Sequence, residues 1–108
     1  MDCESQFEHE IQQAERARQA GNEGMARVCA RRAAGCIIGE FLLRKGLNLP
    51  GSSAYSRLHY LRSMPDVSPS VREAAHVLLL RITPEHELPV ETDLIERTRW
   101  LRETLLES

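Results

Sequence analysis

The sequence lacks the features that would assign it to a common functional class. It contains no phosphate-binding loop and no GxGxxG, GxSxG or HExxH, the usual signatures of kinases, dehydrogenases, hydrolases and zinc proteases. No apolar run reaches the about 18 residues that a membrane-spanning helix needs. Strand-like alternation, internal repeats and low-complexity segments are also missing. We therefore expect one domain over residues 1–108, with no membrane partner.

Cysteine is scarce, and its spacing is uninformative. Cys3, Cys29 and Cys36 form an odd set without CxxC spacing, which is typical of reduced thiols in a cytoplasmic protein. Cys29 and Cys36 lie about 10 Å apart along a helix, too far for a disulfide, so we expect small core residues. His9 near Cys3 does not complete a ligand pattern, so neither a metal nor a cofactor is predicted. The acidic, polar amino terminus is unlike a secretory or transit peptide, which again favours the cytoplasm.

Lysine is almost absent, although the chain has many basic residues. Thirteen of the fourteen are arginine, and Lys45 is the exception. Arginine suits phosphates and carboxylates better than lysine does, but a compositional bias of the source genome explains the excess more simply. The formal net charge is −2, which excludes a general basic field that would attract nucleic acid.

The most informative segment that is present predicts one long helix from Asn22, its cap, to Gly46, its stop. One edge is built of small residues, which lets another helix come close. These are Ala26, Ala30, Ala34, Gly35 and Gly39. Beside that edge runs a bulky apolar stripe that we expect to be buried. It consists of Met25, Val28, Cys29, Cys36, Ile37 and Phe41.

Four further helices are predicted, over about residues 4–20, 54–63, 69–82 and 93–107. Each later helix begins with a capping signal. These signals are Ser52 or Ser53, then Ser68 followed by Pro69, and Asp93 with Glu96. The connections are short, which favours neighbouring helices that run up and down. The predicted fold class is an all-α bundle of four or five helices.

Two features suggest an interface between copies. The second half of the 69–82 helix, including Val77 and Leu80, is apolar nearly all round, as in a helix that is central or covered by a partner. Trp100 lies about 120° around its helix from the apolar stripe that contains Leu94. It either covers its own surface or anchors an interface, where tryptophan is enriched. Val77, Leu80 and Trp100 are the candidate interface residues of a homodimer.

Two arginine–histidine pairs are the candidates for chemistry. Arg72 and His76 share one helix face and are candidates for binding a phosphate or nucleotide. Arg81 and His86 are five positions apart, at the end of a predicted helix and in the connector after it. A histidine that exchanges a proton and an arginine that stabilises a charged phosphorane could together cleave RNA. A solvated surface pair is the simpler explanation of each.

The order of these elements resembles the HEPN family of small, all-helical domains. An amphipathic first helix ends in a Gly-Asn junction, and the alanine-rich helix follows the pattern AxxCARRAAGxxIxxFLLxKG. The short SRLHYLRS helix, a helix ending in LLLRITP and a closing helix complete the resemblance, over about residues 5–106.

The resemblance implies a four- or five-helix bundle that commonly dimerises. Many members are encoded beside a minimal nucleotidyltransferase as toxin–antitoxin pairs. Ribonucleolytic members carry a metal-independent R-x4–6-H motif, facing its copy across the dimer. Arg81 and His86 satisfy that spacing, while Ile82 and Pro84 depart from the usual motif.

We therefore expect a homodimeric, HEPN-like binding and assembly module that acts with a nucleotidyltransferase or a nucleotide ligand. The alternative is a toxin-like endoribonuclease that needs no metal. In that alternative His86 is the general acid or base, and Arg81 holds the scissile phosphate of the RNA.

Overall fold

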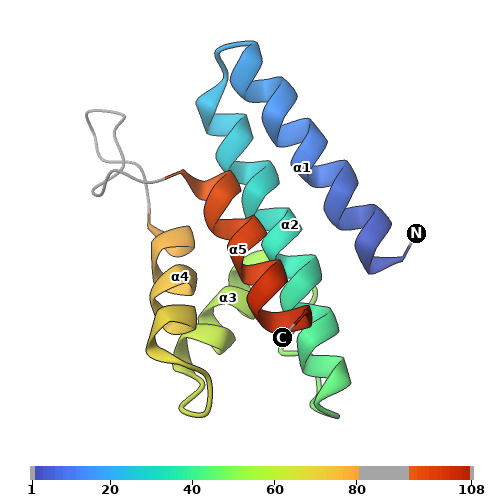
Figure 1. Cartoon of the computed structure of the whole chain (residues 1–108), viewed down its shortest axis with the longest axis vertical. Coiled ribbons are helices and arrows are strands. Elements are labelled where there is room, and N and C mark those ends of the chain that lie inside the picture. Colours follow the sequence, from blue (N-terminus) through green and yellow to red (C-terminus); the bar gives the residue numbers. More distant parts are fainter. Residues whose placement is uncertain (1, 81–92, 108) are drawn as a thin grey trace.

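The fold is known from a computed structural model that describes residues 2–80 and 93–107. Those residues form five α-helices and no strand (Figure 1), which confirms the predicted all-α helical bundle. The helices are α1 (Cys3–Gln19), α2 (Glu23–Arg44), α3 (Ala54–Ser63), α4 (Pro69–Leu79) and α5 (Leu94–Leu106). Their ends agree with the predicted ends to within about two residues, except that α4 ends earlier than expected.

Side chains at the helix starts explain why the helices begin where they do. Each predicted cap accepts a hydrogen bond from a backbone N–H of the first turn, an interaction worth about 1 kcal/mol. These caps are Asn22, Ser53, Ser68 and Asp93. Gly21 and Gly46, with φ of 80° and 74°, follow the ends of α1 and α2 in the left-handed conformation that favours glycine.

The five helices are arranged around α2, which packs against α1, α3 and α5. Figure 1 shows α1 and α2 as an antiparallel hairpin, with α5 lying along α2 and α3 crossing at its lower half. The small edge of α2 is what brings the axes together. Thr98 Oγ1 of α5 lies 3.3 Å from the carbonyl oxygen of Ala30, and both residues are fully buried. The predicted apolar stripe of α5 is likewise buried at Leu94 and Leu101.

The glycines of α2 serve the contact with α3. A Cβ at Gly35 would lie 2.9 Å from the Cα of Ala54, so the start of α3 leaves no room for a side chain. At Gly39 the neighbour is a side chain, because a Cβ there would lie 2.5 Å from Nη1 of Arg57. The helix continues unbroken through both glycines.

One part of the sequence prediction is wrong. Met25 and Val28 were expected in the buried stripe of α2, but they are 46% and 36% exposed. The reason is that α5 packs on the other side of α2, so none of the five described helices other than α1 lies near this end of the stripe. Further along the same stripe, Cys29 and Ile37 are buried as expected.

Candidate functional site

The predicted catalytic pair, Arg81 and His86, lies outside the described residues. Both flanks of that segment are described, and each is tied to the α1–α2 hairpin by an arginine. At the first flank, Arg31 of α2 donates from Nε to the carbonyl of Leu78 at 2.7 Å and from Nη2 to that of Leu80 at 2.9 Å. Burial lowers the pKa of Arg31, as expected for a cation withdrawn from water. Arg31 therefore holds the end of α4 against α2.

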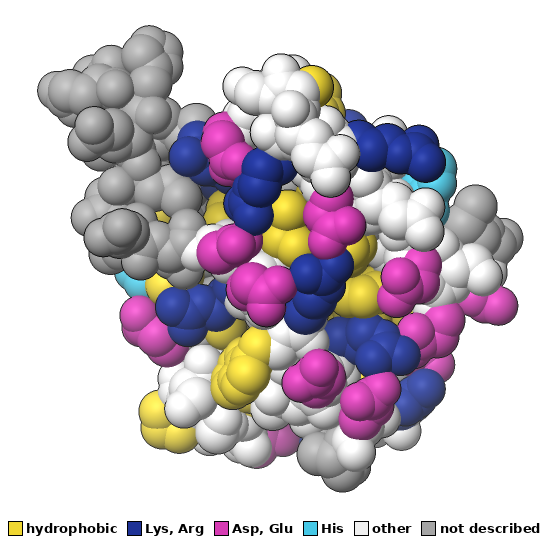
Figure 2. All heavy atoms as spheres, turned by 45° about the horizontal axis from the view of Figure 1, so that its top comes forward, with side chains coloured by type: hydrophobic (Ala, Val, Ile, Leu, Met, Phe, Trp, Pro, Cys, Tyr) yellow, Lys and Arg dark blue, Asp and Glu magenta, His cyan; other side chains and the backbone are white. Residues whose placement is uncertain are grey.

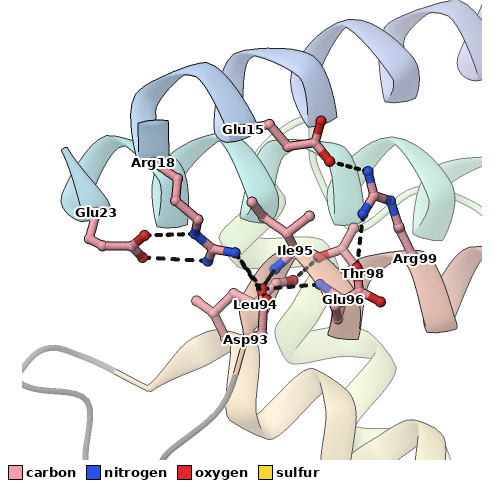
Figure 3. Close-up of polar contacts among 9 residues, drawn as sticks. All are labelled: Glu15, Arg18, Glu23, Asp93, Leu94, Ile95, Glu96, Thr98 and Arg99. Carbon is pink, nitrogen blue, oxygen red and sulfur yellow. Dashed lines mark hydrogen bonds and ion pairs between the residues drawn. The ribbon is translucent and has the colours of Figure 1, made fainter. Parts of the chain in front are cut away.

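At the second flank, Arg18 of α1 binds Asp93, the cap of α5 (Figure 3). Nη1 of Arg18 lies 3.0 Å from both carboxylate oxygens, and its Nε lies 2.7 Å from Oε1 of Glu23. Burial opposes the ionisation of Asp93, but hydrogen bonds from Arg18 and from the backbone of Ile95 and Glu96 outweigh it and lower the pKa. Two arginines thus fix where the chain leaves α4 and where it enters α5.

In the candidate phosphate-binding pair, Arg72 and His76, the arginine contacts the backbone of the chain itself. Nη1 of Arg72 lies 3.1 Å, 3.3 Å and 2.7 Å from the carbonyl oxygens of Met64, Pro65 and Val67, so it closes the connection between α3 and α4. His76 is exposed on α4, and no hydrogen bond among the described residues joins it to Arg72. Phosphate binding by this pair stays a prediction, and it would require Arg72 to share its donors with the loop.

The candidate interface residues do not form one surface. Val77 is 3% exposed and belongs to the core of the single chain, because α4 turns this side toward its neighbours. Leu80 is half-buried, and Trp100 is 37% exposed. Trp100 borders a shallow hollow of about 290 Å³ that is also lined by Asp93, Glu96 and Arg97. A homodimer through Leu80 and Trp100 stays a prediction.

A polar groove, which the sequence did not lead us to expect, runs between α1 and α2. It consists of two hollows of about 510 Å³ and 330 Å³, which share Glu10 and Arg32 in their linings and so form one feature. The first hollow extends to Ala20 at the end of α1, and the second extends to Arg57 of α3. We call this feature the α1–α2 groove. Its polar lining includes Gln6, His9, Glu10, Gln13, Arg16 and Arg32.

Helical periodicity explains how the groove arises. At about 100° per residue, Gln6, Glu10 and Gln13 lie within about 60° of one another on α1, away from Glu4 and Glu15, which pair with α5. On α2, Arg32 lies about 160° around the helix from Ala30, which receives α5, and Cys29 and Cys36 lie within about 60° of Arg32. The signal in the sequence is the spacing of three polar residues on α1.

The groove holds charges that the fold leaves unpaired. Arg16 and Arg32 are exposed, and among the described residues neither forms a hydrogen bond or an ion pair. Glu10 lines both hollows, as Arg32 does, and its Oε2 is buried without a hydrogen-bond partner among the described residues. Burial raises the pKa of the neighbouring Cys29 and Cys36 thiols, and the Glu10 charge adds to this effect. The thiols therefore stay neutral, and two arginines and one carboxylate set the local field.

The structure also brings together two cysteines that are far apart in the sequence. The thiol of Cys3 donates to the carbonyl of Cys36 over 3.4 Å. Burial, together with the nearby Cys36 and two carboxylates, raises the pKa of Cys3 to about 11. A thiol with such a pKa is a poor nucleophile near neutral pH. Within residues 2–80 and 93–107, no group of three or more His, Cys, Asp or Glu is arranged to hold a metal.

Comparisons with known proteins add no identity to this site. No family model matches the chain, and neither a curated protein nor a solved structure is significantly similar to it. Among the described helices, none combines the length and the apolar character required to cross a membrane. The site must therefore be interpreted from its own geometry.

Proposed function

We propose that this protein is a binding and assembly module of the HEPN type, which self-associates and acts with a nucleotidyltransferase or a nucleotide ligand in the cytoplasm. The observation that supports this proposal is the α1–α2 groove, whose Arg16 and Arg32 side chains make no ion pair within the described residues. Because these guanidinium groups are exposed beside a concave surface, they are available to a ligand. Arginine forks favour phosphates and carboxylates, which both a nucleotide and a protein partner can supply.

Nucleotide binding can be tested by adding ATP or GTP to the isotope-labelled protein and following its amide NMR signals. The expected result is a saturable shift of signals from α1 and α2, which Arg32→Glu weakens by about tenfold. Arg27→Glu is the matched control, because Arg27 lies on the other side of α2. Saturable shifts confined to Arg72 and His76 would instead support the pair that the sequence suggested. If neither nucleotide shifts any signal, the nucleotide part of the proposal is wrong.

Self-association can be tested by size-exclusion chromatography with light scattering. We expect a dimer at micromolar concentration, which Trp100→Glu shifts toward the monomer by placing a charge at an exposed aromatic. Trp100 is only partly buried, so the folded monomer should survive this change. A clean monomer of the unaltered protein at high micromolar concentration would contradict a homodimer.

A second candidate function, a metal-independent endoribonuclease, rests on the spacing of Arg81 and His86. In this reaction His86 removes the proton of a ribose 2′-hydroxyl, whose oxygen attacks phosphorus as the 5′-oxygen leaves, and Arg81 stabilises the phosphorane. The arginine contacts at Leu80 and Asp93 support this alternative, because they fix the two flanks of the segment. The binding module and the endoribonuclease can be distinguished by incubating RNA, in the presence of a chelator, with either the unaltered protein or His86→Ala. If the two proteins degrade RNA equally, or not at all, the enzymatic alternative is wrong.

A further inference from the structure

The α1–α2 hairpin has two sides with opposite charge patterns. On one side it receives α5, and Arg99 and Arg102 of α5 pair with Glu15 and Glu4 of α1. Figure 2 shows how dark-blue and magenta side chains alternate over the surface in that view. On the other side lies the α1–α2 groove, whose cations are on the hairpin itself. Toward α5 the hairpin therefore presents Glu4 and Glu15, together with Arg18 at the helix cap, whereas in the groove it presents Arg16 and Arg32 around Glu10.

The cations are distributed along the groove rather than gathered at one point. Arg16 lines the end of the groove near the α1–α2 turn, and Arg32 lines both hollows. Arg57 lines the far end, where its guanidinium donates to the carbonyls of Gly35 and Gly51. These acceptors are neutral, so they do not cancel the positive charge of Arg57. From Gln6 to Ala20 the groove follows α1 for about 21 Å, or about four helical turns.

The carboxylate of Glu10 selects among the ligands that such cations attract. It lies in the part of the groove that both hollows share, and its Oε2 has no donor. This carboxylate offsets part of the attraction of Arg32 for any anion, so a compact phosphate gains less there than a ligand that also brings a donor for Glu10. A longer ligand can carry carboxylates at the ends and a donor, such as an amide or an ammonium group, at the middle.

The floor of the groove suits a helix. Ala17 and Ala20 of α1 contribute little side-chain volume to the lining. Small residues allow a third helix to lie between two others, as Ala30 of α2 already does for α5 on the opposite side. The positive charges of the groove, its length and its small lining residues all fit a helix that lies along it.

We propose that the α1–α2 groove docks an acidic helix of a partner protein, with its carboxylates on Arg16 and Arg32 and a polar donor at Glu10. This inference rests on the proposed assembly function and names the chemistry of the partner. It shares Arg32 with the proposed nucleotide site and is independent of the homodimer, because Trp100 does not line the groove.

The test uses a fluorescent, alanine-rich probe peptide of about 20 residues, which is long enough to be helical in water. One face of the peptide carries glutamates toward both ends and a glutamine at the centre. Fluorescence anisotropy at low salt should show saturable binding to the whole chain that weakens as salt is added. Arg32→Glu should weaken binding by about tenfold or more, while Arg27→Glu should leave it within about twofold. A probe with lysines in place of the glutamates should not bind.

A charge-reversal variant shows whether a loss of binding is due to the changed charge or to a failure to fold. Arg16→Glu combined with Arg32→Glu should keep the helical circular dichroism of the unaltered protein and should bind the lysine probe instead. If the glutamate probe does not bind at high micromolar concentration in low salt, or binds equally well after Arg32→Glu, the helix-docking inference is overturned. Groove signals shifted by ATP without any response to the probe would overturn it as well. That last result would leave the proposed binding function standing.

Discussion

The two sides of the α1–α2 hairpin are made from the same two helices, yet their charged side chains make different contacts. Toward α5, Arg99 pairs with Glu15 of α1 (Figure 3). Arg102 pairs with Glu4 of α1, and the Thr98 hydroxyl donates to the backbone carbonyl of Ala30 in α2. Toward the groove, Arg16 and Arg32 have no such counterparts among the described residues. One side of the hairpin is therefore occupied by contacts of the fold, while the other carries arginines that make no such contacts among the described residues.

Neighbouring residues on α2 make this contrast measurable. Arg31 and Arg32 are adjacent in the chain, but Arg31 donates to the end of α4 while Arg32 faces the groove. Similarly, Ala30 receives α5 while Ala17 lines the groove. Matched substitutions at these positions separate a residue that stabilises the fold from one that does not.

The largest effect is expected from removing the guanidinium of Arg31. Arg31→Met leaves two carbonyls at the end of α4 without their charged donor, which should lower the free energy of unfolding by about 1.5–3 kcal/mol. Arg32→Met removes no contact of the fold and should stay within about 0.5 kcal/mol. Urea unfolding followed by circular dichroism measures both values. Equal losses would mean that the two sides of the hairpin do not differ as described.

A similar loss is expected from enlarging the small edge of α2. Ala30→Leu places a bulky side chain against α5 and should destabilise the protein by about 1–3 kcal/mol through overpacking. Ala17→Leu extends into the groove and should change the free energy of unfolding by no more than about 0.5 kcal/mol. Thermal unfolding of the two variants checks this pair. A large loss from Ala17→Leu would show that the groove is closed by packing.

A smaller effect is expected where α3 ends the groove. Gly35→Ala forces the start of α3 away from α2, and the overpacking should exceed the gain in helix propensity by on the order of 1 kcal/mol. Gly24→Ala is the control, because a Cβ there would meet only Asn22 Oδ1 at 3.8 Å. It should stabilise the protein by about 0.5–1 kcal/mol. Differential scanning calorimetry compares them, and stabilisation by Gly35→Ala would contradict the close approach.

The smallest effect concerns the thiol of Cys3. Its folded-state pKa of about 11 is raised from the ordinary value of 9.0, so it favours the protonated form in the folded protein. This contribution to stability is complete below about pH 9 and is lost as the pH rises through about 11. Comparing unfolding free energies of the protein and Cys3→Ala across this range isolates it. At pH 8, Cys3 should also be alkylated up to about 100-fold more slowly than an unperturbed thiol, and an unperturbed rate would contradict this.

The secondary structure could be predicted from the sequence because its signals are local. Asn22, Ser68 and Asp93 each cap a helix through bonds to residues two or three positions away, so a short stretch of sequence contains the whole interaction. The small edge of α2 was predicted for a similar reason, since helical periodicity alone brings its alanines together. Which neighbour uses that edge was not predictable without the tertiary contacts.

The candidate site was less predictable because its properties depend on distant residues. Arg72 stays a candidate phosphate ligand, but its local sequence does not reveal that its Nη1 contacts three backbone carbonyls of the α3–α4 connection. In the sequence, Arg16 and Arg32 are part of a general excess of arginine, and only the packed structure shows that their side chains make no ion pair with the rest of residues 2–80 and 93–107. Met25 was placed in the core because a single helix cannot reveal on which side its neighbours stop.

The hydroxyl of Thr98 acts as a register mark for the pairing of α5 with α2. Sliding α5 by one turn, about 5.4 Å, would bring either Leu94 or Arg102 opposite Ala30, and neither side chain is short enough for so narrow a gap. Residues on the outer faces of the two helices can therefore vary without shifting their register, provided that position 30 keeps a small alanine and position 98 keeps a compact threonine.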